Sequence, residues 1–375
     1  MIDAPGPWGT GPFVLSEGYS SLSNEIALIS ANPFTCIWLD TAQDRTPRVV
    51  LTANPDHWNT ERGPRLEKVV FRNDVSPREA LRLVCDTQGE VDIVTEVSPA
   101  DAERVKTSQH ARLVSTDAMR VVVGIINRDA VPFGDKRARQ ALNLAVDRDK
   151  LIREGFKDYA YPTVGLTPPY SAGYCKNRGP YPHDPGEARR LFEQVGYPSG
   201  RALKLAVLPG LEGVANLLAD DLRVGLGIQV NVIAIPAENL LAAQHAFVEK
   251  VLPLTFDVLL FSWFDLTADA PASFLHSWLY HSLGPFRAGP PIEAFERLMA
   301  KYVRQTDPQK RNALDEEMER LAYDQALSIF LCAPQALYAV NQHVRFVGHA
   351  ATFEVADTEV DEEHWSRGAA ATPQS

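Results

Sequence analysis

The chain has 375 residues, which is enough for two domains or for one large one. Hydrophobic residues make up 45% of it and charged residues 23%, as in ordinary globular proteins, and no apolar run approaches the ~20 residues that span a bilayer. The formal net charge of −11 argues against nucleic acid and anionic membrane surfaces as partners, because both are bound through basic surfaces.

The first part of the chain predicts short strands and helices. Residues 1–5 contain neither the basic nor the apolar segment of a signal peptide. Residues 9–15 predict a glycine- and proline-rich turn that leads into a strand, and without a GxxxxGK[ST] pattern this turn is not a phosphate-binding loop. Residues 66–72 alternate as in a strand, and Ser76 followed by Pro77 predicts the start of a helix.

The segment from 120 to 152 connects two parts of the predicted fold. A continuous apolar and β-branched run at 121–126 predicts a strand that is buried on both faces. Asp135 can then cap a helix, and small apolar residues recur at helical spacing over 138–145. A buried strand followed by an amphipathic helix is typical of the point where one α/β lobe ends and the next begins.

The alternation of strands and helices continues to about residue 340. The predicted helices are 188–195, 213–224, 236–248, 291–305 and 307–325, and the predicted strands are 203–208, 228–235, 256–263, 327–331 and 335–340. The residues after Val347 are rich in acidic side chains and predict a mobile tail.

Several motifs occur in the order found in one known family. PFGDKRARQAL at 132–142, followed by AVDR at 145–148, closely resembles a segment of the family 5 extracellular solute-binding proteins. This is the dipeptide-, oligopeptide- and nickel-binding group that supplies ABC importers. LTANPDHW at 51–58 and DPGEARRLFEQVGY at 184–197 resemble further segments of the family, and the resemblance implies that Trp58 packs under the first lobe.

The resemblance implies an α/β, two-lobed, periplasmic-binding-protein-like fold of type II and family 5. The GTGP motif at 9–12 lies well inside mature members of the family, so we expect a fold that is shortened at its N-terminus. The expected domains are a partial lobe I at 1–126 plus 334–350, lobe II at 127–333, and an acidic mobile tail at 351–375.

The loop after the predicted strand 256–263 is the first candidate for a binding site. Ligands of open α/β sheets bind beyond the carboxyl ends of strands, and two lobes joined by two crossings form a cleft that closes by hinge motion. The resemblance implies that the loop after Trp263 binds an extended peptide, and that an aspartate three positions further binds its α-amino group. Leu266 occupies that position here, and a one-residue slip would give the role to Asp265, with Asp269 nearby.

Phe264, Asn127 and Arg128 complete the predicted set of ligand-binding residues. Asn127 and Arg128 lie near the first predicted crossing, where we favour hinge hydrogen bonds over ligand contact. An alternative role for Trp263 is packing in the core, and an alternative role for Asp265 is capping the next helix.

The sequence predicts neither a metal site nor a cofactor. The four cysteines are scattered without a CxxC motif, and His276 and His281 are five positions apart, which is unfavourable for one helical face. Glu90 and Asp92 form a carboxylate pair of the kind that is common at the solvent-exposed start of a strand. No GxSxG motif supports catalysis.

We therefore predict a non-enzymatic substrate-binding protein of an ABC importer. It would capture a peptide or a similar small polar solute between its lobes, outside the cytoplasm, and deliver it to the permease subunits. One alternative is a cytoplasmic ligand-sensing or regulatory module that reuses this fold. The other is a hydrolase that uses one of the carboxylate pairs.

Overall fold

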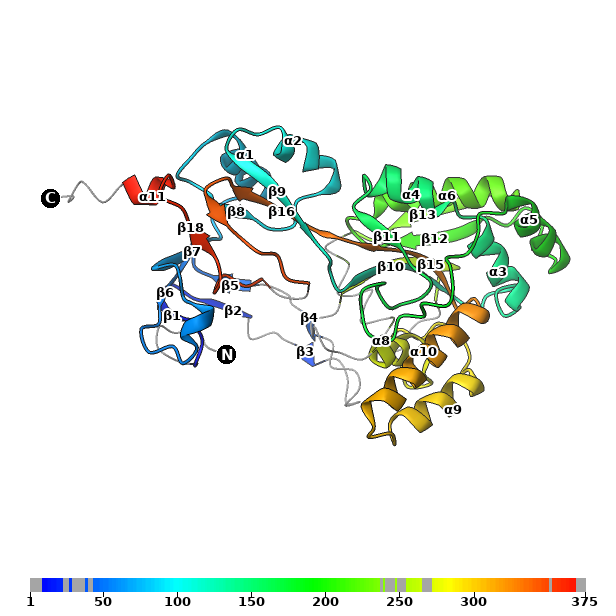
Figure 1. Ribbon diagram of the computed structural model, residues 1–375. Coiled ribbons are helices and arrows are strands. Elements are labelled where there is room, and N and C mark those ends of the chain that lie inside the picture. The colour runs from blue at the N-terminus through cyan, green and yellow to red at the C-terminus, as the bar shows by residue number, and fades with distance from the viewer. Residues whose placement is uncertain are drawn as a thin grey trace. The chain divides into compact units, whose positions relative to one another are not determined.

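The computed structural model describes residues 9–22, 27–28, 38–39, 43–236, 239, 247, 254–264, 272–350 and 353–368. The chain forms two compact units (Figure 1). Unit 1 comprises Met1–Ala27, Leu39–Asp117 and Ala336–Ser375, and unit 2 comprises Leu28–Trp38 and Ala118–Gln335. The lobe boundaries inferred from the sequence stay a prediction.

Unit 2 is built on a six-stranded mixed sheet with the strand order β11-β15-β10-β14-β12-β13. Its strands are β10 (Arg120–Ile126), β11 (Ala160–Pro162), β12 (Leu203–Val207), β13 (Val230–Ala234), β14 (Val258–Phe264) and β15 (Ser328–Pro334). The strand β10 runs antiparallel to both β14 and β15, whereas β12 runs parallel to β13 and β14. Residues 121–126 of β10 are all buried, which confirms the predicted buried strand.

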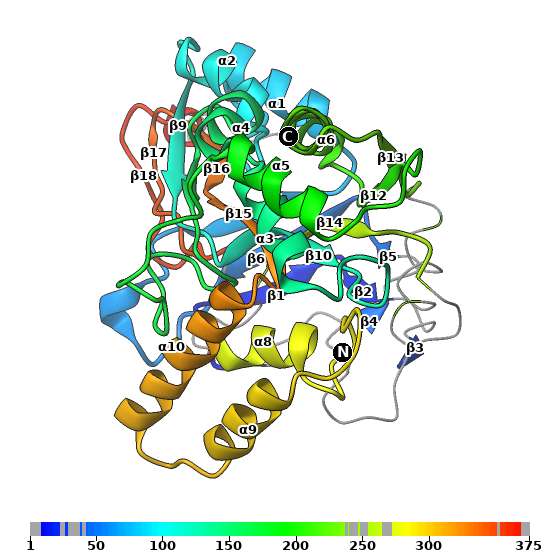
Figure 2. The ribbon, with the colours of Figure 1, turned by 90° about the vertical axis from the view of Figure 1, so that its right-hand side faces the viewer.

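Helices cover both faces of this sheet. One face is covered by α3 (Lys136–Leu144), α4 (Arg148–Gly155), α5 (Pro185–Gln194) and α6 (Glu212–Leu226), and the other by α8 (Ala272–Tyr280), α9 (Glu293–Tyr302) and α10 (Pro308–Asp324). Figures 1 and 2 show α4, α5 and α6 opposite α8, α9 and α10. Because side chains alternate along a strand, Val122 and Ile126 pack under the first group, and Val123 and Ile125 under the second.

Side-chain caps fix the helix starts that the sequence predicted. Asp135, Asp184 and Asp307 accept backbone hydrogen bonds at the starts of α3, α5 and α10. The helix α6 ends at Gly227, whose φ of 69° is left-handed and suits glycine. The predicted helix 236–248 lies almost entirely outside the described residues.

Two buried arginines join these helices to the sheet. Arg148, the first residue of α4, is 5% exposed and donates to the carbonyls of Phe330 (2.7 Å), Asn143 (3.0 Å) and Tyr181 (3.2 Å). Burial lowers the pKa of Arg148 to about 10. Arg139 of α3 donates to carbonyls just before α3 and just after α10. The motif that resembles the family is therefore a hydrogen-bond network between helices and sheet.

We expect Arg148→Met to lower the free energy of unfolding by at least about 3 kcal/mol, because two or more buried carbonyls would lose a charged donor. Urea denaturation followed by circular dichroism measures this change. Arg153→Met is the matched control in the same helix, since the Arg153 side chain is 60% exposed and its replacement should change stability by less than about 0.5 kcal/mol. Equal effects of the two substitutions would contradict the role of the network.

Unit 1 contains two three-stranded sheets. The first has the order β1-β6-β7 and consists of β1 (Phe13–Glu17), β6 (Arg48–Ala53) and β7 (Lys68–Arg72). The second has the order β8-β16-β9, consists of β8 (Ile93–Val94), β9 (Ala111–Thr116) and β16 (Ala336–Asn341), and packs against α1 (Pro77–Asp86) and α2 (Ala102–Lys106). As predicted, Ser76 caps α1 and Pro77 is its first residue.

Short elements complete the described part of the chain. They are β2 (Ser20–Leu22), β3 (Ala27–Leu28), β4 (Trp38–Leu39), β5 (Gln43–Arg45), β17 (Val344–Arg345), β18 (Glu359–Val360), η1 (Thr60–Arg62), η2 (Pro99–Asp101) and α11 (Trp365–Gly368). The strands β17 and β18 pair with each other in antiparallel fashion.

Part of the predicted tail, residues 353–368, packs on the rest of unit 1. The carboxylates of Glu354 and Asp357 lie 2.6 and 3.3 Å from the guanidinium of Arg62. His364, which is 3% exposed, places its Nε2 atom 3.0 Å from a carboxylate oxygen of Asp92. The acidic residues of this segment are thus ion-pair partners within unit 1.

Asp92 is an anchor for this C-terminal segment. The oxygen that contacts His364 also accepts hydrogen bonds from the indole of Trp365 (2.8 Å) and the amide of Asn341 (3.2 Å). One oxygen of the Asp92 carboxylate therefore holds three side chains, two of them in the C-terminal segment.

Trp58 is 75% exposed, so the prediction that it packs under the first lobe is wrong. The Nδ1 atom of His57 lies 3.0 Å from the carbonyl oxygen of Thr10, which holds the His57 ring against the protein. The next side chain in this turn, that of Trp58, then points to solvent.

Candidate functional site

The carboxyl ends of four strands lie at one end of the sheet in unit 2. β12, β13 and β14 are parallel, and β15 runs in the same direction because β14 and β15 are both antiparallel to β10. The longer segment of unit 2, Ala118–Gln335, begins just before β10 and ends just after β15. Both ends of this segment therefore adjoin the end of the sheet where ligands of α/β folds are expected.

Two predicted site residues reach this end on β14. Trp263 and Phe264 are the last residues of the strand and pair with the first two residues of β10. The side chains of Trp263 and Phe264, and the whole of Asp265 and Asp269, lie outside the described residues. Their contact with a ligand stays a prediction.

Two tyrosines that the sequence analysis missed lie at the same end. The Tyr170 hydroxyl donates to the carbonyl of Ala118 and accepts from its N–H group at 3.1 Å. The hydroxyl of Tyr161 accepts from the Gln335 amide at 3.0 Å, and its ring meets that of Tyr170 edge-on at 6.2 Å. These tyrosines hold both ends of the segment Ala118–Gln335. The signal for Tyr170 was the run TPPYSAGY at 167–174, which is rich in proline and tyrosine.

Asn127 and Arg128 lie at the opposite end of the sheet from Trp263 and Phe264. They follow the last residue of β10, which pairs with the first residue of β14. A strand of seven residues separates the two ends by about 20 Å. The structure therefore does not bring the predicted site residues together. The chain enters unit 2 before β10, and Asn127 and Arg128 come after it.

Asn127 extends the contact between β10 and β14. Its side chain is 5% exposed, and Nδ2 donates to the carbonyl of Phe256 at 3.0 Å. Its Oδ1 atom accepts from the N–H group of Asp129 at 3.2 Å, and its own N–H group donates to the carbonyl of Asp257 at 2.8 Å. These bonds favour a structural role for Asn127 over ligand contact.

Asp257 ties the start of β14 to the start of β12. Its carboxylate is 2% exposed, forms an ion pair with Arg201 and accepts the N–H group of Lys204 at 2.9 Å. The Arg201 guanidinium lies over the ring of Tyr197, 5.3 Å from its centroid. Asp257 thus orders the strand that leads to Trp263.

Arg128 is a buried cation without a full set of partners. It is 7% exposed, and its Nη2 atom is buried without a hydrogen bond in the described part of the chain. Burial, together with the nearby charge of Arg139, lowers the pKa of Arg128 to about 10. Gly289 packs against it: a Cβ atom on Gly289, whose φ is 119°, would lie 2.6 Å from the Arg128 Cβ.

The lowered pKa of Arg128 predicts how its charge affects stability. A pKa below the ordinary value of an arginine means that the folded state disfavours the charged form. The resulting loss of stability is fully present below about pH 10, and it disappears as the pH rises from there toward the ordinary pKa of arginine.

We expect Arg128→Met to raise the free energy of unfolding at neutral pH by about 1–3 kcal/mol, because it removes a buried and incompletely paired cation. Urea denaturation measures the gain, which should shrink above the pKa of Arg128. Arg137→Met, at a side chain that is 50% exposed, is the control and should change stability by less than about 0.5 kcal/mol. Lower stability of Arg128→Met than of the unmodified protein would contradict this account.

The histidines named in the sequence analysis have carboxylate partners. His276 and Glu319 form an ion pair in which both side chains are fully buried, and Glu319 also accepts the N–H group of Thr167 at 3.1 Å. His281 lies 3.1 Å from a carboxylate oxygen of Glu296. Among the described residues there is no group of three or more histidine, cysteine, aspartate or glutamate side chains that could hold a metal ion.

The fold is that of a solute-binding protein. CtaP, an ABC transporter substrate-binding protein from Listeria monocytogenes, superposes with a TM-score of 0.75 at 17% identity, over 94% of this chain and 67% of CtaP. NikA from Brucella suis, solved with Fe(III)-EDTA, superposes with a TM-score of 0.73 at 19% identity, over 94% of this chain and 68% of NikA. The predicted α/β, two-lobed fold is confirmed.

The chain belongs to the bacterial extracellular solute-binding proteins of family 5, whose profile for the middle region matches residues 3–283. This finding confirms the resemblance that the sequence motifs indicated. In the part of the chain that the structure describes, no helix has both the length and the apolar character needed to cross a membrane.

Curated relatives cover different shares of the chain. Di/tripeptide-binding protein 2 of Pseudomonas aeruginosa is 24% identical over 351 residues, which are 90% of this chain and 58% of that protein. Glutathione-binding protein GsiB of Salmonella typhimurium is 30% identical over 139 residues, 36% of this chain and 26% of GsiB. The chain thus spans less than two thirds of the length of these relatives.

Proposed function

We propose that this chain captures a di- or tripeptide, or a similar small polar solute, for an ABC importer. The observation that carries the proposal is the meeting of four strand ends and both ends of the segment Ala118–Gln335 at one end of the unit 2 sheet. Membership of a solute-binding family and relatives named for di/tripeptide binding support it. The protein would act in the periplasm or outside the cell, together with permease subunits.

In this proposal the ligand lies beyond the carboxyl end of β14. Trp263 and Phe264 would supply apolar contact, and the backbone after Trp263 would bind the peptide main chain. Asp265 or Asp269 would hold the α-amino group through a charge-assisted hydrogen bond. Asn127 and Arg128, about 20 Å away along β10, would act only through the position of the strands.

Binding in this manner involves no reaction of the ligand. Closure of the lobes removes water from the ligand, which strengthens its hydrogen bonds and the ion pair at its amino group. Release then requires reopening, so the affinity must stay moderate enough for transfer to a permease.

A thermal-shift screen against di-, tri- and tetrapeptides tests this function. A ligand present at ~100 times its dissociation constant should add about 2.7 kcal/mol to the free energy of unfolding, which raises the melting temperature measurably. Trp263→Ala should abolish the shift.

Trp58→Ala is the matched control, because Trp58 is 75% exposed and belongs to unit 1. It should leave the peptide shift unchanged. No shift with any peptide from a folded protein, or a shift that survives Trp263→Ala, would contradict the proposed site.

A further inference from the structure

Tyr161 is an exposed aromatic residue at the end of the unit 2 sheet where the peptide site is proposed. It is the middle residue of β11, an edge strand of the sheet, and pairs with Ala333 near the carboxyl end of β15. Tyr161 is 40% exposed, whereas the preceding Ala160 is 7% exposed. The peptide contacts proposed for Trp263 and the residues after it do not involve Tyr161.

Strand pairing places Tyr161 in one row with the end of β14. Its partner Ala333 lies beside Val121 in the antiparallel register of β15 and β10, and Val121 pairs with Trp263. The row crosses three strand spacings between β11 and β14, and each spacing is about 4.8 Å. Tyr161 is therefore about 14 Å from Trp263, measured along the row between their backbones.

The side chain of Tyr161 lies on the face of the sheet that α8 covers. Ala160 and Cys332 both pack in the cluster under α3, α4, α5 and α6. Because side chains alternate along a strand, the next residues, Tyr161 and Ala333, lie on the opposite face. The helix α8 covers this opposite face and is the next described element after β14. The segment between Trp263 and α8, which the proposed function assigns to peptide binding, thus leads to the face that carries Tyr161.

The Tyr161 ring is held in a fixed position. Its hydroxyl accepts from the Gln335 amide at 3.0 Å, and its ring meets that of Tyr170 edge-on, with centroids 6.2 Å apart and an interplanar angle of 72°. The Tyr170 hydroxyl is bonded in turn to the backbone of Ala118. Aromatic rings prefer offset-stacked and edge-on partners, so this pair of rings offers a third ring a favourable place to pack. Because the ring is already fixed, little side-chain freedom is lost when a ligand contacts it.

A peptide that begins beyond β14 reaches toward Tyr161 with its third residue. An extended chain rises about 3.3 Å per residue, so the third Cα atom lies about 7 Å from the first. A large side chain on the third residue covers the remaining distance toward the Tyr161 ring. A dipeptide in the same position ends short of it.

We propose that Tyr161 selects tripeptides that carry an aromatic side chain on the third residue. This inference rests on the proposed function, in which the α-amino group of the peptide is held by Asp265 or Asp269. Aromatic pairs contribute more than the apolar area that they bury, so an aromatic third residue is favoured over an aliphatic one.

Isothermal titration calorimetry with Ala-Ala-Phe and Ala-Ala-Leu tests the proposal. The unmodified protein should bind Ala-Ala-Phe at least about threefold more tightly than Ala-Ala-Leu, as expected for one aromatic pair. Tyr161→Leu should reduce this preference to less than about 1.5-fold, because it removes the ring. Tyr161→Phe should keep the preference, because it keeps the ring and loses only the hydrogen bond to Gln335.

The position of the aromatic residue in the peptide provides a control. Phe-Ala-Ala and Leu-Ala-Ala carry the same side chains on the first residue, which lies beyond β14 and away from β11. Tyr161→Leu should leave the ratio of these two affinities unchanged. A change in this ratio as large as that for the third residue would contradict the assigned position.

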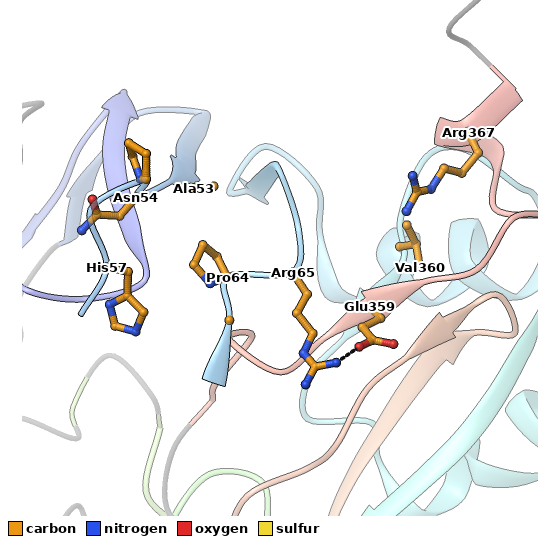
Figure 3. A pocket seen from close by; sticks show the side chains of 10 residues that line it. Ala53, Asn54, His57, Pro64, Arg65, Glu359, Val360 and Arg367 are labelled. Atoms are coloured by element: carbon orange, nitrogen blue, oxygen red, sulfur yellow. Dashed lines mark hydrogen bonds and ion pairs between the residues drawn. The ribbon is translucent and has the colours of Figure 1, made fainter. Parts of the chain in front are cut away.

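A pocket of unit 1 provides a control for peptide binding elsewhere on the protein. It has a volume of about 680 Å³, and its lining includes Asn54, His57, Arg65 and Arg367 (Figure 3). Arg65→Gln, which removes the ion pair with Glu359, should leave the preference for Ala-Ala-Phe unchanged. Loss of the preference in Arg65→Gln would place the aromatic side chain in unit 1 and overturn the proposal.

The outcomes separate the role of Tyr161 from peptide capture itself. Equal affinities for Ala-Ala-Phe and Ala-Ala-Leu, or a preference that survives Tyr161→Leu, would overturn the role of Tyr161 and leave peptide capture standing. Loss of the preference in Tyr161→Phe would show that the ring is not the contact. No binding of any tripeptide by the folded protein would contradict the proposed function together with this inference.

Discussion

The guanidinium of Arg148 is the contact on which unit 2 depends. It lies where α3, α4 and β15 meet, and the carbonyls that it satisfies belong to buried residues. Asn143 extends this network, since its side chain contacts both Arg148 and the backbone of β15. These bonds hold α3 and α4 against β15, whose carboxyl end lies in alignment with those of β12, β13 and β14.

That alignment explains why one end of the sheet is the candidate site and the other is not. At one end, tyrosine hydroxyls and strand ends lie beside both ends of the segment Ala118–Gln335. At the other, Asn127 and Asp257 satisfy backbone groups of unit 2 itself. The candidate binding site and the bonds that support the sheet thus lie at opposite ends of β14.

Local signals in the sequence predicted much of the fold. The apolar run of β10 and the caps at Asp135, Asp184 and Asp307 are encoded within a few residues. Contacts between distant residues were not predictable in this way, because no pattern at Asp92 indicates His364 as its partner. For the same reason the sequence did not show that Asn127 lies at the opposite end of the sheet from Trp263.

The division of the chain between the two units has a consequence for synthesis on the ribosome. Almost all of unit 2 is one uninterrupted stretch, Ala118–Gln335, and its sheet can be complete once β15 has emerged. In unit 1, β9 waits for β16, whose first residue pairs with Thr116 across more than half of the chain. The strand β9, which emerges before the main segment of unit 2, therefore completes its sheet after that segment, and its apolar face needs protection until β16 arrives.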